Sequence, residues 1–393
     1  TKCNFIFKIL MKKKIYYWGP FIDNVATIKA ILNSAYSINK YSKSFETSII
    51  NAVGEWDEVN LDQKNKYIKF INFKNKFYKK LPRYRFLFSR ISYLIIFFKS
   101  FFPLKNLILK DKPDYLIIHL IVSLPLILFK LFNFDTKLCL RISGKPHLNL
   151  IRRTLWKFSS DKVHLVFCPT QETKEILIKE KIFKCEILTL YDPVIYHKDI
   201  KKLKDENIFD ENNFKKNNIT MLGRLTKQKN HLLIINNFQS IIKFYPNLCI
   251  NIFGEGELNK DLLNLVKKKN LDKNIIFHGY TDNVFKYLKA SKIFLLTSLW
   301  EDPGFVLIEA AYCDTLIVSS NCPSGPKEFC DKNSGFLFEN NSAKSLTDTL
   351  HLALKTDERK KRTKIINAKK KVKLFSIFYH FKTLERYLLN QKL

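Results

Sequence analysis

Short apolar runs alternate with longer amphipathic stretches along the chain from Lys14 onward. A short apolar run bounded by turn residues is typical of a buried strand, whereas apolar residues that recur with helical spacing are typical of an amphipathic helix. Their alternation predicts βαβ units and a parallel sheet. In the first half, the pattern predicts strands over 15–18, 47–53, 115–119, 137–142, 163–168 and 186–190, and helices that include 24–39 and 170–179.

A polar and charged stretch between Asp192 and Lys216 interrupts this pattern, and we expect a domain linker there. A second alternating series follows it. This series predicts strands over 219–222, 248–253, 274–277, 293–297, 315–319 and 335–338, and helices that include 230–244, 257–269 and 304–313. The chain is therefore expected to form two doubly wound α/β domains, in which ligands lie outside the carboxyl ends of the strands.

The composition is consistent with two α/β domains, and the net charge indicates the kind of partner. The chain has 393 residues, of which 46% are hydrophobic, so it can build the cores of two domains. Ten Gly and twelve Pro exclude collagen-like and low-complexity architectures. The formal charge, 68 − 36 = +32, indicates an anionic partner and leaves nucleic acid, acidic lipid and a phosphorylated substrate open.

The cysteines and the apolar segments argue against a metal site and against membrane insertion. Eight Cys are scattered without a C-x-x-C pair or a neighbouring His at zinc-finger spacing, so we expect reduced thiols of a cytosolic protein. Residues 1–10 lack a small-residue cleavage site, so no secretory signal is expected. The longest apolar run, 115–129, is shorter than the roughly 20 residues of a spanning helix, so no transmembrane helix is expected.

The segment from Lys64 to Lys110 stands apart, because it has 13 Lys and Arg but no Asp or Glu in 47 residues. Tyr, Phe, Ile and Leu are interleaved with these cations. We interpret it as an amphipathic basic surface that lies on anionic lipid, where each cation near the headgroups contributes about 1 kcal/mol. The alternatives are a platform for single-stranded nucleic acid and a pair of ordinary packing helices with solvated Lys.

The loop after predicted strand 219–222 carries two cations five residues apart. It places Gly223, Arg224 and Lys229 just before a predicted helix. Both side chains and the helix N-terminus can face one anion, so the loop suits a diphosphate. Surface charge beside a turn is the alternative interpretation.

Two further loops also close a strand and open a helix. The first holds Gly254 and Gly256, which permit a close approach of the backbone to a ligand, although a plain turn has the same pattern. The second, 277–282, includes Tyr280 and has the same arrangement.

The stretch 298–311 places two carboxylates around a helix start. Pro303 and Gly304 begin a helix whose free N–H groups can bind an anion, while Glu301 precedes that start and Glu309 lies inside the helix. Carboxylates that accept sugar and ribose hydroxyls on either side of a phosphate fit this spacing better than the paired acids of a glycoside hydrolase. In the alternative interpretation, Glu301 interacts only with the helix dipole and Glu309 is solvated.

These loops, in this order, resemble the donor-binding domain of glycosyltransferase family 4. The matching segments are 222–224, 254–256, 278–280, the pair Glu301 and Glu309, and 321–328. The resemblance covers residues 217–340 well, and the first half only loosely, through 112–119 and the turn 18–20.

The resemblance implies the GT-B fold, in which two facing Rossmann-like domains hold a nucleotide sugar and C-terminal helices cross back to the first domain. The expected organisation is an acceptor-binding domain over 11–195, a linker over 196–216, a donor-binding domain over 217–365 and a returning helix over 366–393. The resemblance also implies transfer with retention at the anomeric carbon, without a metal or another cofactor.

The resemblance assigns roles to individual residues. Arg224 and Lys229 would neutralise the donor diphosphate and the charge that develops on the leaving group. Glu301 would contact the donor sugar and Glu309 the ribose hydroxyls. His119 would face the donor sugar from the first domain, and a structural His is the alternative there. The remaining donor-binding positions are Gly223, Gly254, Gly256, Tyr280 and the N–H groups of Gly304, Phe305 and Val306.

Two departures from the family pattern affect these roles. The usual Glu-Gly-Phe-Gly opening is replaced here by Glu-Asp-Pro-Gly at 301–304, which changes sugar recognition more than phosphate binding. The Gly-rich turn of the first domain is reduced to Gly19.

We therefore expect a hexosyltransferase that moves a hexose or N-acetylhexosamine from a nucleotide sugar, UDP-linked, to a lipid-linked or surface-polysaccharide acceptor, as in lipopolysaccharide or capsule synthesis. It would be cytoplasmic and peripheral at the inner face of the cell membrane, with no nucleic-acid partner. The alternative is a non-enzymatic basic protein that binds nucleic acid or membranes on a related fold. A phosphorylase or a sugar-nucleotide epimerase with a similar two-domain cleft also remains open.

Overall fold

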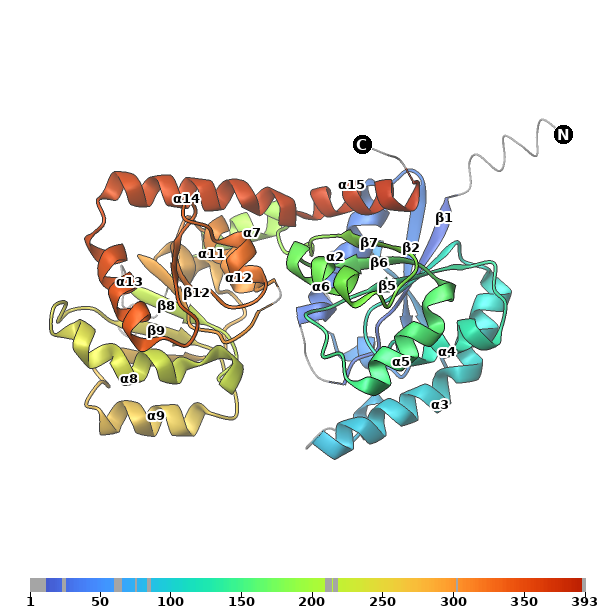
Figure 1. Ribbon diagram of the computed structural model, residues 1–393, viewed down its shortest axis with the longest axis horizontal. Coiled ribbons are helices and arrows are strands. Elements are labelled where there is room, and N and C mark those ends of the chain that lie inside the picture. The colour runs from blue at the N-terminus through green and yellow to red at the C-terminus, as the bar shows by residue number, and fades with distance from the viewer. Residues whose placement is uncertain are drawn as a thin grey trace. The chain divides into compact units, whose positions relative to one another are not determined.

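The structure is a computed structural model that describes residues 12–22, 26–59, 66–74, 76–82, 86–208, 214, 218–301 and 303–390. The chain forms two compact units: unit 1 runs to Pro193 and resumes at Ile377, and unit 2 is Val194–Ser376. Each unit is built on one parallel sheet that helices cover (Figure 1). This confirms the prediction of two Rossmann-like α/β domains.

Unit 1 contains a seven-stranded parallel sheet in the order β3-β2-β1-β4-β5-β6-β7. Its central strands are apolar and buried, as expected where helices cover both faces. The strand order reverses between β1 and β4, so a ligand crevice is expected at the carboxyl ends of these two strands. The strands are β1 (Lys13–Trp18), β2 (Phe45–Asn51), β3 (Lys69–Asn72), β4 (Tyr115–Ile118), β5 (Lys137–Arg141), β6 (Val163–Cys168) and β7 (Glu186–Thr189).

The strand β3 was not predicted, and it lies inside the basic segment that we interpreted as a lipid-facing surface. It pairs with β2 at the edge of the sheet, with Ile49 opposite Phe70. A lysine on a half-exposed edge strand is a common protection against further strand pairing, so cations here have a structural reason. The segment is therefore divided between an edge strand and a helix, its contact with lipid stays a prediction, and residues 64, 65, 75 and 83–85 of it lie outside the described residues.

The helices of unit 1 include one long helix, α3, and a last helix, α15, that comes from the end of the chain. They are α2 (Ala26–Tyr41), α3 (Phe86–Asp111), α4 (Ser123–Leu131), α5 (Leu150–Ser159), α6 (Gln171–Glu180) and α15 (Ile377–Leu388), with 3-10 turns at η1 (Glu55–Glu58), η3 (Tyr78–Lys80) and η4 (Ser160–Lys162). By length and composition alone, Phe88–Asp111 is the one described helix that is long and apolar enough to cross a membrane.

Helix α15 is tied to the rest of unit 1 by hydrogen bonds as well as by packing on α2. The ring of His380 bonds to Ser34 Oγ through Nε2 and to the Tyr191 carbonyl through Nδ1, at 2.7 Å each. Tyr115 Oη donates to the Leu388 carbonyl at 2.6 Å. The chain thus returns to its first unit, as the resemblance implied, and it does so through α15.

Unit 2 contains a six-stranded parallel sheet in the order β10-β9-β8-β11-β12-β13. All six predicted strands are confirmed. They are β8 (Ile219–Leu222), β9 (Ile250–Phe253), β10 (Ile275–Gly279), β11 (Ile293–Leu296), β12 (Leu316–Ser320) and β13 (Phe336–Phe338). The helices are α7 (His197–Lys204), α8 (His231–Ile242), α9 (Asn259–Lys268), α10 (Phe285–Lys289), α11 (Phe305–Tyr312), α12 (Gly325–Phe329), α13 (Ala343–Lys355) and α14 (Glu358–Val372), with η5 (Lys227–Lys229) and η6 (Lys373–Phe375).

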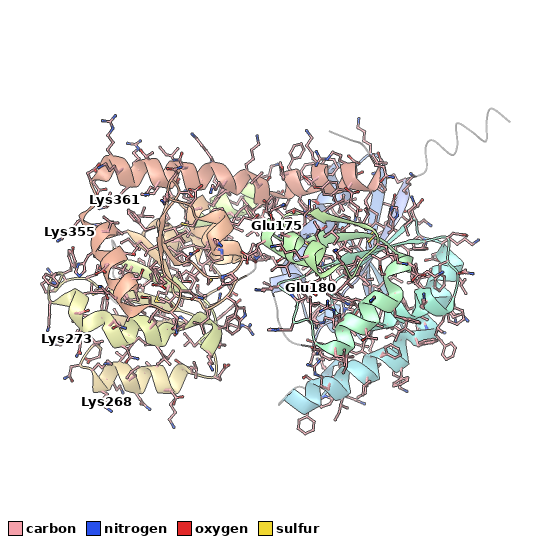
Figure 2. All side chains as sticks on the ribbon, in the orientation of Figure 1. Glu175, Glu180, Lys268, Lys273, Lys355 and Lys361 are labelled. Atoms are coloured by element: carbon pink, nitrogen blue, oxygen red, sulfur yellow. The ribbon has the colours of Figure 1, made fainter. Side chains whose placement is uncertain are left out.

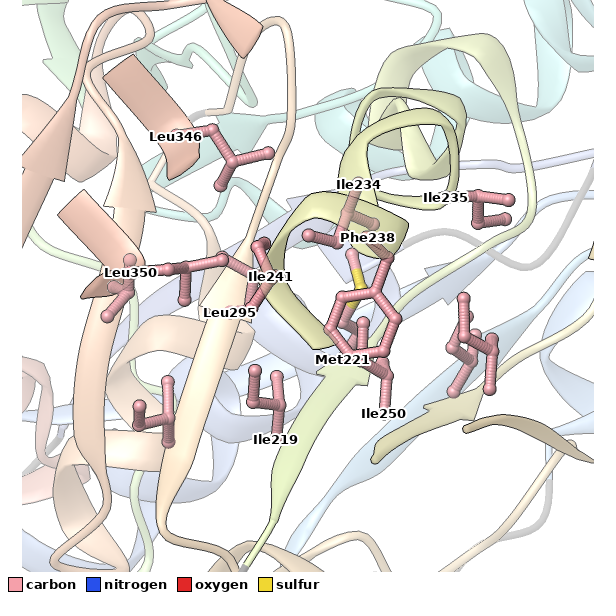
Figure 3. Close-up of a cluster of buried hydrophobic side chains, with 14 of the residues drawn as sticks. Ile219, Met221, Ile234, Ile235, Phe238, Ile241, Ile250, Leu295, Leu346 and Leu350 are labelled. Carbon is pink, nitrogen blue, oxygen red and sulfur yellow. The ribbon is translucent and has the colours of Figure 1, made fainter. Parts of the chain in front are cut away.

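The core of unit 2 lies between this sheet and the helices α8 and α13. Ile234, Phe238 and Ile241 of α8 point toward Met221 and Leu295 of the strands (Figure 3). The i, i+4, i+7 spacing on α8 is what the amphipathic pattern of the sequence predicted.

The two ends of unit 2 are joined by backbone hydrogen bonds. The N–H groups of Val194 and Ile195 both donate to the Phe375 carbonyl, at 2.9 and 3.0 Å. Helix α7 occupies the first part of the range that we expected to be a linker, and Asn283 Nδ2 beside α10 donates to its Leu203 carbonyl at 2.8 Å. Residues 209–213, 215 and 216 of that range lie outside the described residues.

Candidate active site

The loop after β8 turns sharply at Gly223 and leads into α8. Gly223 has a φ of +143° and donates its N–H to the Phe253 carbonyl at 3.0 Å. Arg224 follows with an exposed side chain, and no partner of its guanidinium is found among the described residues. Lys229 ends η5, and Asn230, with a φ of +50°, connects it to α8. Both predicted cations therefore lie at the carboxyl end of β8, as the spacing indicated.

The glycines at 254 and 256 bring two loops together. A Cβ at Gly254 would lie 2.0 Å from the Gly223 carbonyl oxygen, and one at Gly256 would lie 2.4 Å from the Leu225 carbonyl oxygen. The loops are also joined by a hydrogen bond from Leu225 N to the Glu255 carbonyl, 2.8 Å long. We expected these glycines to let the backbone approach a ligand, and the structure shows that they let one loop approach another. They hold Gly223 and Arg224 in place.

Lys229 and Glu301 form an ion pair between the loop after β8 and the segment after β11. Lys229 Nζ bonds to Glu301 Oε1, and both side chains are largely buried. Ser298 Oγ donates to the same carboxylate oxygen at 2.7 Å, and Thr297 Oγ1 donates to the Lys229 carbonyl at 2.8 Å. The sequence pattern assigned no role to Ser298, although its position directly after a buried strand was a usable signal. The arrangement places a positive and a negative group side by side at the edge of the sheet.

The backbone of Glu301 is held by the loop after β12. Its N–H donates to the Pro323 carbonyl at 2.8 Å, and its carbonyl accepts from Ser324 N at 2.7 Å. These two backbone hydrogen bonds orient the Glu301 side chain without occupying its carboxylate. The second carboxylate oxygen can therefore accept a further hydrogen bond.

Helix α11 begins at Gly304, which has a φ of +83°. Among the described residues no side chain caps this N-terminus, and Phe305 and Val306 are half-buried. The first N–H groups of such a helix point outward and favour an anion. Glu309, in the second turn, is buried, so the interpretation of a solvated Glu309 is wrong.

The positive charge of this region comes from its Lys and Arg residues and not from His231. Burial, and then the neighbouring Lys229 cation, lower the pKa of His231 to about 4, so the ring is neutral at neutral pH. Tyr280 follows β10 with an exposed ring, and its hydrogen bond to Asp282 raises the pKa of its hydroxyl. An exposed ring at this position can stack on a planar base.

His119 lies in unit 1, directly after β4, where the strand order reverses. Burial first, and then the charges of Arg141 and His380, hold the pKa of His119 well below its ordinary value, so the imidazole is neutral. Its buried Nε2 has no hydrogen-bond partner among the described residues. A neutral imidazole nitrogen without a partner can donate a hydrogen bond to a hydroxyl group or accept one from it. Gly19 packs beside it, where a Cβ would lie 2.5 Å from Ile31 Cδ1.

A buried ion pair that sequence reasoning missed lies near His119. Arg141 Nη2 bonds to Asp192 Oδ1 at 2.5 Å, and both residues are buried. An arginine directly after the apolar residues 138–140 of the predicted strand 137–142 was the available signal, since a buried charge requires a partner.

The predicted residues thus gather in two places. The carboxyl ends of the unit 2 strands collect Gly223, Arg224, Lys229, Tyr280, Glu301, Glu309 and the start of α11, because parallel strands end at one edge of the sheet. His119 lies at the corresponding edge of unit 1. No group of three or more His, Cys, Asp or Glu that could hold a metal ion is found among the described residues, and none of the seven cysteines that the structure describes forms a disulfide.

Comparisons with known proteins relate the chain to glycosyltransferases. Residues 204–372 match the family described as "Glycosyl transferases group 1". An uncharacterized glycosyltransferase of Methanocaldococcus jannaschii is 31% identical over 254 residues, which are 58% of this chain and 61% of that protein. A Campylobacter jejuni N-acetylgalactosaminyltransferase, whose name specifies a diphospho-undecaprenol-linked substrate, is 32% identical over 193 residues, 49% of this chain and half of that protein. The chain thus spans less than two thirds of the length of these two relatives.

Solved structures extend the likeness over almost the whole chain. The crystal structure of Anabaena HepE in complex with UDP has a TM-score of 0.70 and 14% sequence identity, and it covers 97% of this chain and 100% of that one. At this identity the likeness concerns the fold. The fold is that of the GT-B glycosyltransferases, as the resemblance implied.

Proposed function

We propose that the chain is a family 4 hexosyltransferase that transfers a hexose or N-acetylhexosamine, with retention, from a UDP-linked sugar to a lipid-linked or polysaccharide acceptor. The observation that carries the proposal is the proximity of Lys229, Glu301 and the start of α11, which no described side chain caps, at one edge of the unit 2 sheet. The family match over 204–372 and the UDP bound to the structural neighbour support it.

Two cations and one helix N-terminus suit the diphosphate of the donor. Arg224, exposed and unpaired among the described residues, and Lys229 would bind the phosphates. In the transfer, the bond from the anomeric carbon to the diphosphate oxygen breaks and the bond to the acceptor oxygen forms. The leaving nucleoside diphosphate gains charge, so both cations stabilise the transition state more than the ground state.

Hydrogen-bond acceptors and a neutral histidine suit the hydroxyl groups of the donor. Glu301 would contact the sugar, Glu309 the ribose, and Tyr280 the base, while Gly304, Phe305 and Val306 would offer N–H groups. His119 would contribute a neutral ring to sugar hydroxyls. No metal or organic cofactor enters this scheme.

The acceptor side of the proposal rests on the relatives and on charge. The Campylobacter jejuni relative is named for a diphospho-undecaprenol-linked substrate, and this chain has a net charge of +32. A lipid-linked acceptor places the enzyme at the inner face of the cell membrane, where the cations of residues 64–110 would contact anionic lipid.

The first experiment is calorimetric binding of UDP, GDP and UDP-sugars to the full chain and to Arg224→Ala and Glu309→Ala. We expect UDP to bind, and each substitution to weaken binding at least about tenfold, because each removes a charged hydrogen-bonding group. Lys227→Ala is the matched control, since Lys227 is an exposed cation of the same loop that the family pattern does not use. Binding of RNA in place of every nucleotide would overturn the proposal.

Turnover is tested with a polyprenyl-diphosphate-linked sugar and a UDP-sugar. Retention predicts a product whose new glycosidic bond has the anomeric configuration of the donor, which NMR reads directly. An inverted product would reject the retaining mechanism and leave donor binding intact.

A further inference from the structure

Helix α3 has two apolar sides, of which only one is used in packing. Its inner side consists of Ile96, Leu104 and Ile108, which are buried in unit 1. The outer side carries large apolar residues at spacings of three, four, four and seven, and we call it the α3 ridge: Ile91, Leu94, Phe98, Phe102 and Leu109. All five are exposed, Phe98 by 69%. Aromatic rings stand out from α3 on the side away from the sheet (Figure 2).

The first turn of α5 adds two more exposed aliphatic residues beside this helix. Leu150 and Ile151 are 81% and 80% exposed, more than any other large apolar residue described. Burial, and then the Arg90 cation of α3, lower the pKa of Arg152, so the two guanidinium groups lie within electrostatic reach of each other. Helix α4 packs against both α3 and α5, which brings the two helices to the same side of unit 1 (Figure 1).

The charges around this surface are mostly positive, and the one acid of α3, Asp111 in its last turn, accepts a hydrogen bond from Tyr16 Oη. No Asp or Glu occurs from residue 64 to 110 or within α5, whereas α3 carries Lys99 and Lys105 and α5 carries Arg152 and Lys157. Acidic residues of unit 1 such as Glu175 and Glu180 lie on α6 (Figure 2), where Glu180 pairs with Arg153 at 2.9 Å. An apolar surface that is bordered by cations is complementary to the acyl chains and anionic headgroups of a bilayer.

We propose that the α3 ridge and the first turn of α5 insert together into the surface of an anionic bilayer. The inference deepens the proposed function, because it names the inserted elements where that function required only an electrostatic contact. Insertion of apolar side chains gives binding a component that salt does not screen, unlike the attraction of exposed cations.

Two other occupants of this surface are less compatible with the structure. A second copy packed ridge to ridge would bring Lys99 and Lys105 of both α3 helices close together, where the like charges repel each other. A spanning orientation of α3 would require lipid around the whole helix, but Ile96, Leu104 and Ile108 are packed in the core of unit 1. The helix therefore lies along the bilayer surface.

Vesicle flotation of the full chain tests the proposal. We expect the wild type to float with phosphatidylcholine vesicles that contain phosphatidylglycerol, and part of it to remain bound at high salt. The variant Phe98→Ser with Leu150→Ser is expected to lower the partition coefficient at least about tenfold and to abolish the salt-resistant part. Phe244→Ser is the matched control, because Phe244 is 71% exposed on unit 2. Its flotation should equal that of the wild type.

Three outcomes would overturn the proposal: flotation of the double variant like the wild type, complete release of the wild type by salt, or a concentration-dependent dimer that the double variant abolishes. The last would assign the surface to a second copy. UDP binding by the same variants separates this proposal from the proposed function. If the wild type inserts into vesicles but binds no nucleotide, the proposed function is rejected and the proposal of membrane insertion is retained.

Discussion

Lys229 and Glu301 lie 72 residues apart in the chain and form the central contact of the candidate site. Because both side chains are largely buried, each charge depends on the other for compensation. The hydrogen bond from Ser298 supplies part of that compensation to Glu301. The pair thus has a structural role in the absence of a donor, in addition to any contact with phosphate or sugar.

A double-mutant cycle on this pair should show strong coupling. Lys229→Met leaves the Glu301 carboxylate buried without its cation, and we expect a loss of about 3 kcal/mol in the free energy of unfolding of unit 2. Adding Glu301→Gln removes the uncompensated charge and should restore at least about 1 kcal/mol. Urea unfolding measures both. Purely additive losses would show that the pair is not coupled.

The loops after β8, β9 and β10 are held together by backbone contacts in which glycine is required. Gly254 has a φ of +136° and donates its N–H to the Gly279 carbonyl at 2.8 Å, while its Cα faces the Gly223 carbonyl. No side chain can take part in so close an approach. The position of Arg224 therefore depends on a neighbouring loop.

Gly254→Ala is expected to destabilise unit 2 by at least about 2 kcal/mol and to weaken UDP binding, because the new Cβ pushes the Gly223 carbonyl away. Gly279→Ala serves as the control. Gly279 also has a positive φ, +70°, but the nearest atom to its Cβ would be Glu255 Oε1 at 4.0 Å. Its cost should be about 1 kcal/mol, from backbone strain alone. Equal losses of stability in the two variants would contradict a role for the contact between the loops of Gly254 and Gly223.

Helix α15 makes the stability of unit 1 sensitive to acid. Burial lowers the pKa of His380 from its ordinary 6.5 to about 3. The unfolded chain takes up a proton near pH 6.5, whereas the folded chain resists protonation down to about pH 3. The contribution of neutral His380 to the free energy of unfolding is therefore fully present above pH 6.5. It is lost as the pH drops toward 3, by up to about 1.4 kcal/mol per pH unit. Buried His119 acts in the same direction.

Thermal unfolding between neutral pH and about pH 5 measures this effect. We expect the melting temperature of unit 1 to fall with pH, and His380→Gln to reduce that slope while it lowers the neutral-pH stability through its lost bond to Ser34. His147→Gln is the control, because His147 is exposed. A melting temperature that is independent of pH in this range would contradict the assignment.

At the scale of the whole molecule, unit 2 is continuous in sequence and unit 1 is not. The Phe375 carbonyl accepts the N–H groups of Val194 and Ile195, which joins the two ends of unit 2. Unit 1 instead takes its last helix from beyond unit 2, and Tyr115, Ser34 and the Tyr191 carbonyl all bond to that helix.

The separate expression of the two units should therefore give different results. Residues 194–376 are expected to fold alone and to bind UDP, whereas residues 1–193 should unfold at a much lower temperature because the apolar face of α2 that covers α15 becomes exposed. Joining 377–393 to 1–193 through a flexible linker should restore folding. Circular dichroism and thermal melts measure each fragment, and a native-like melt of 1–193 alone would reject this dependence.

The sequence by itself determined both parallel-sheet domains and the order of the site loops. Buried parallel strands are apolar on both faces and loops follow them at regular intervals, so six strands of unit 1 and all six of unit 2 could be located. The cations at 224 and 229 and the carboxylate at 301 were found for the same reason, since they follow these strands directly. The strand β3 was missed because half-exposed edge residues lack that apolar signal.

Only the tertiary structure decided which side chains meet. The bond between Lys229 and Glu301, the burial of Glu309 and the packing of Gly254 on Gly223 join segments that are distant in the chain, and no local pattern encodes such contacts. The same holds for the α3 ridge. Its apolar residues resemble those of a buried helix in the sequence, and only the packing of the opposite side shows that they face outward.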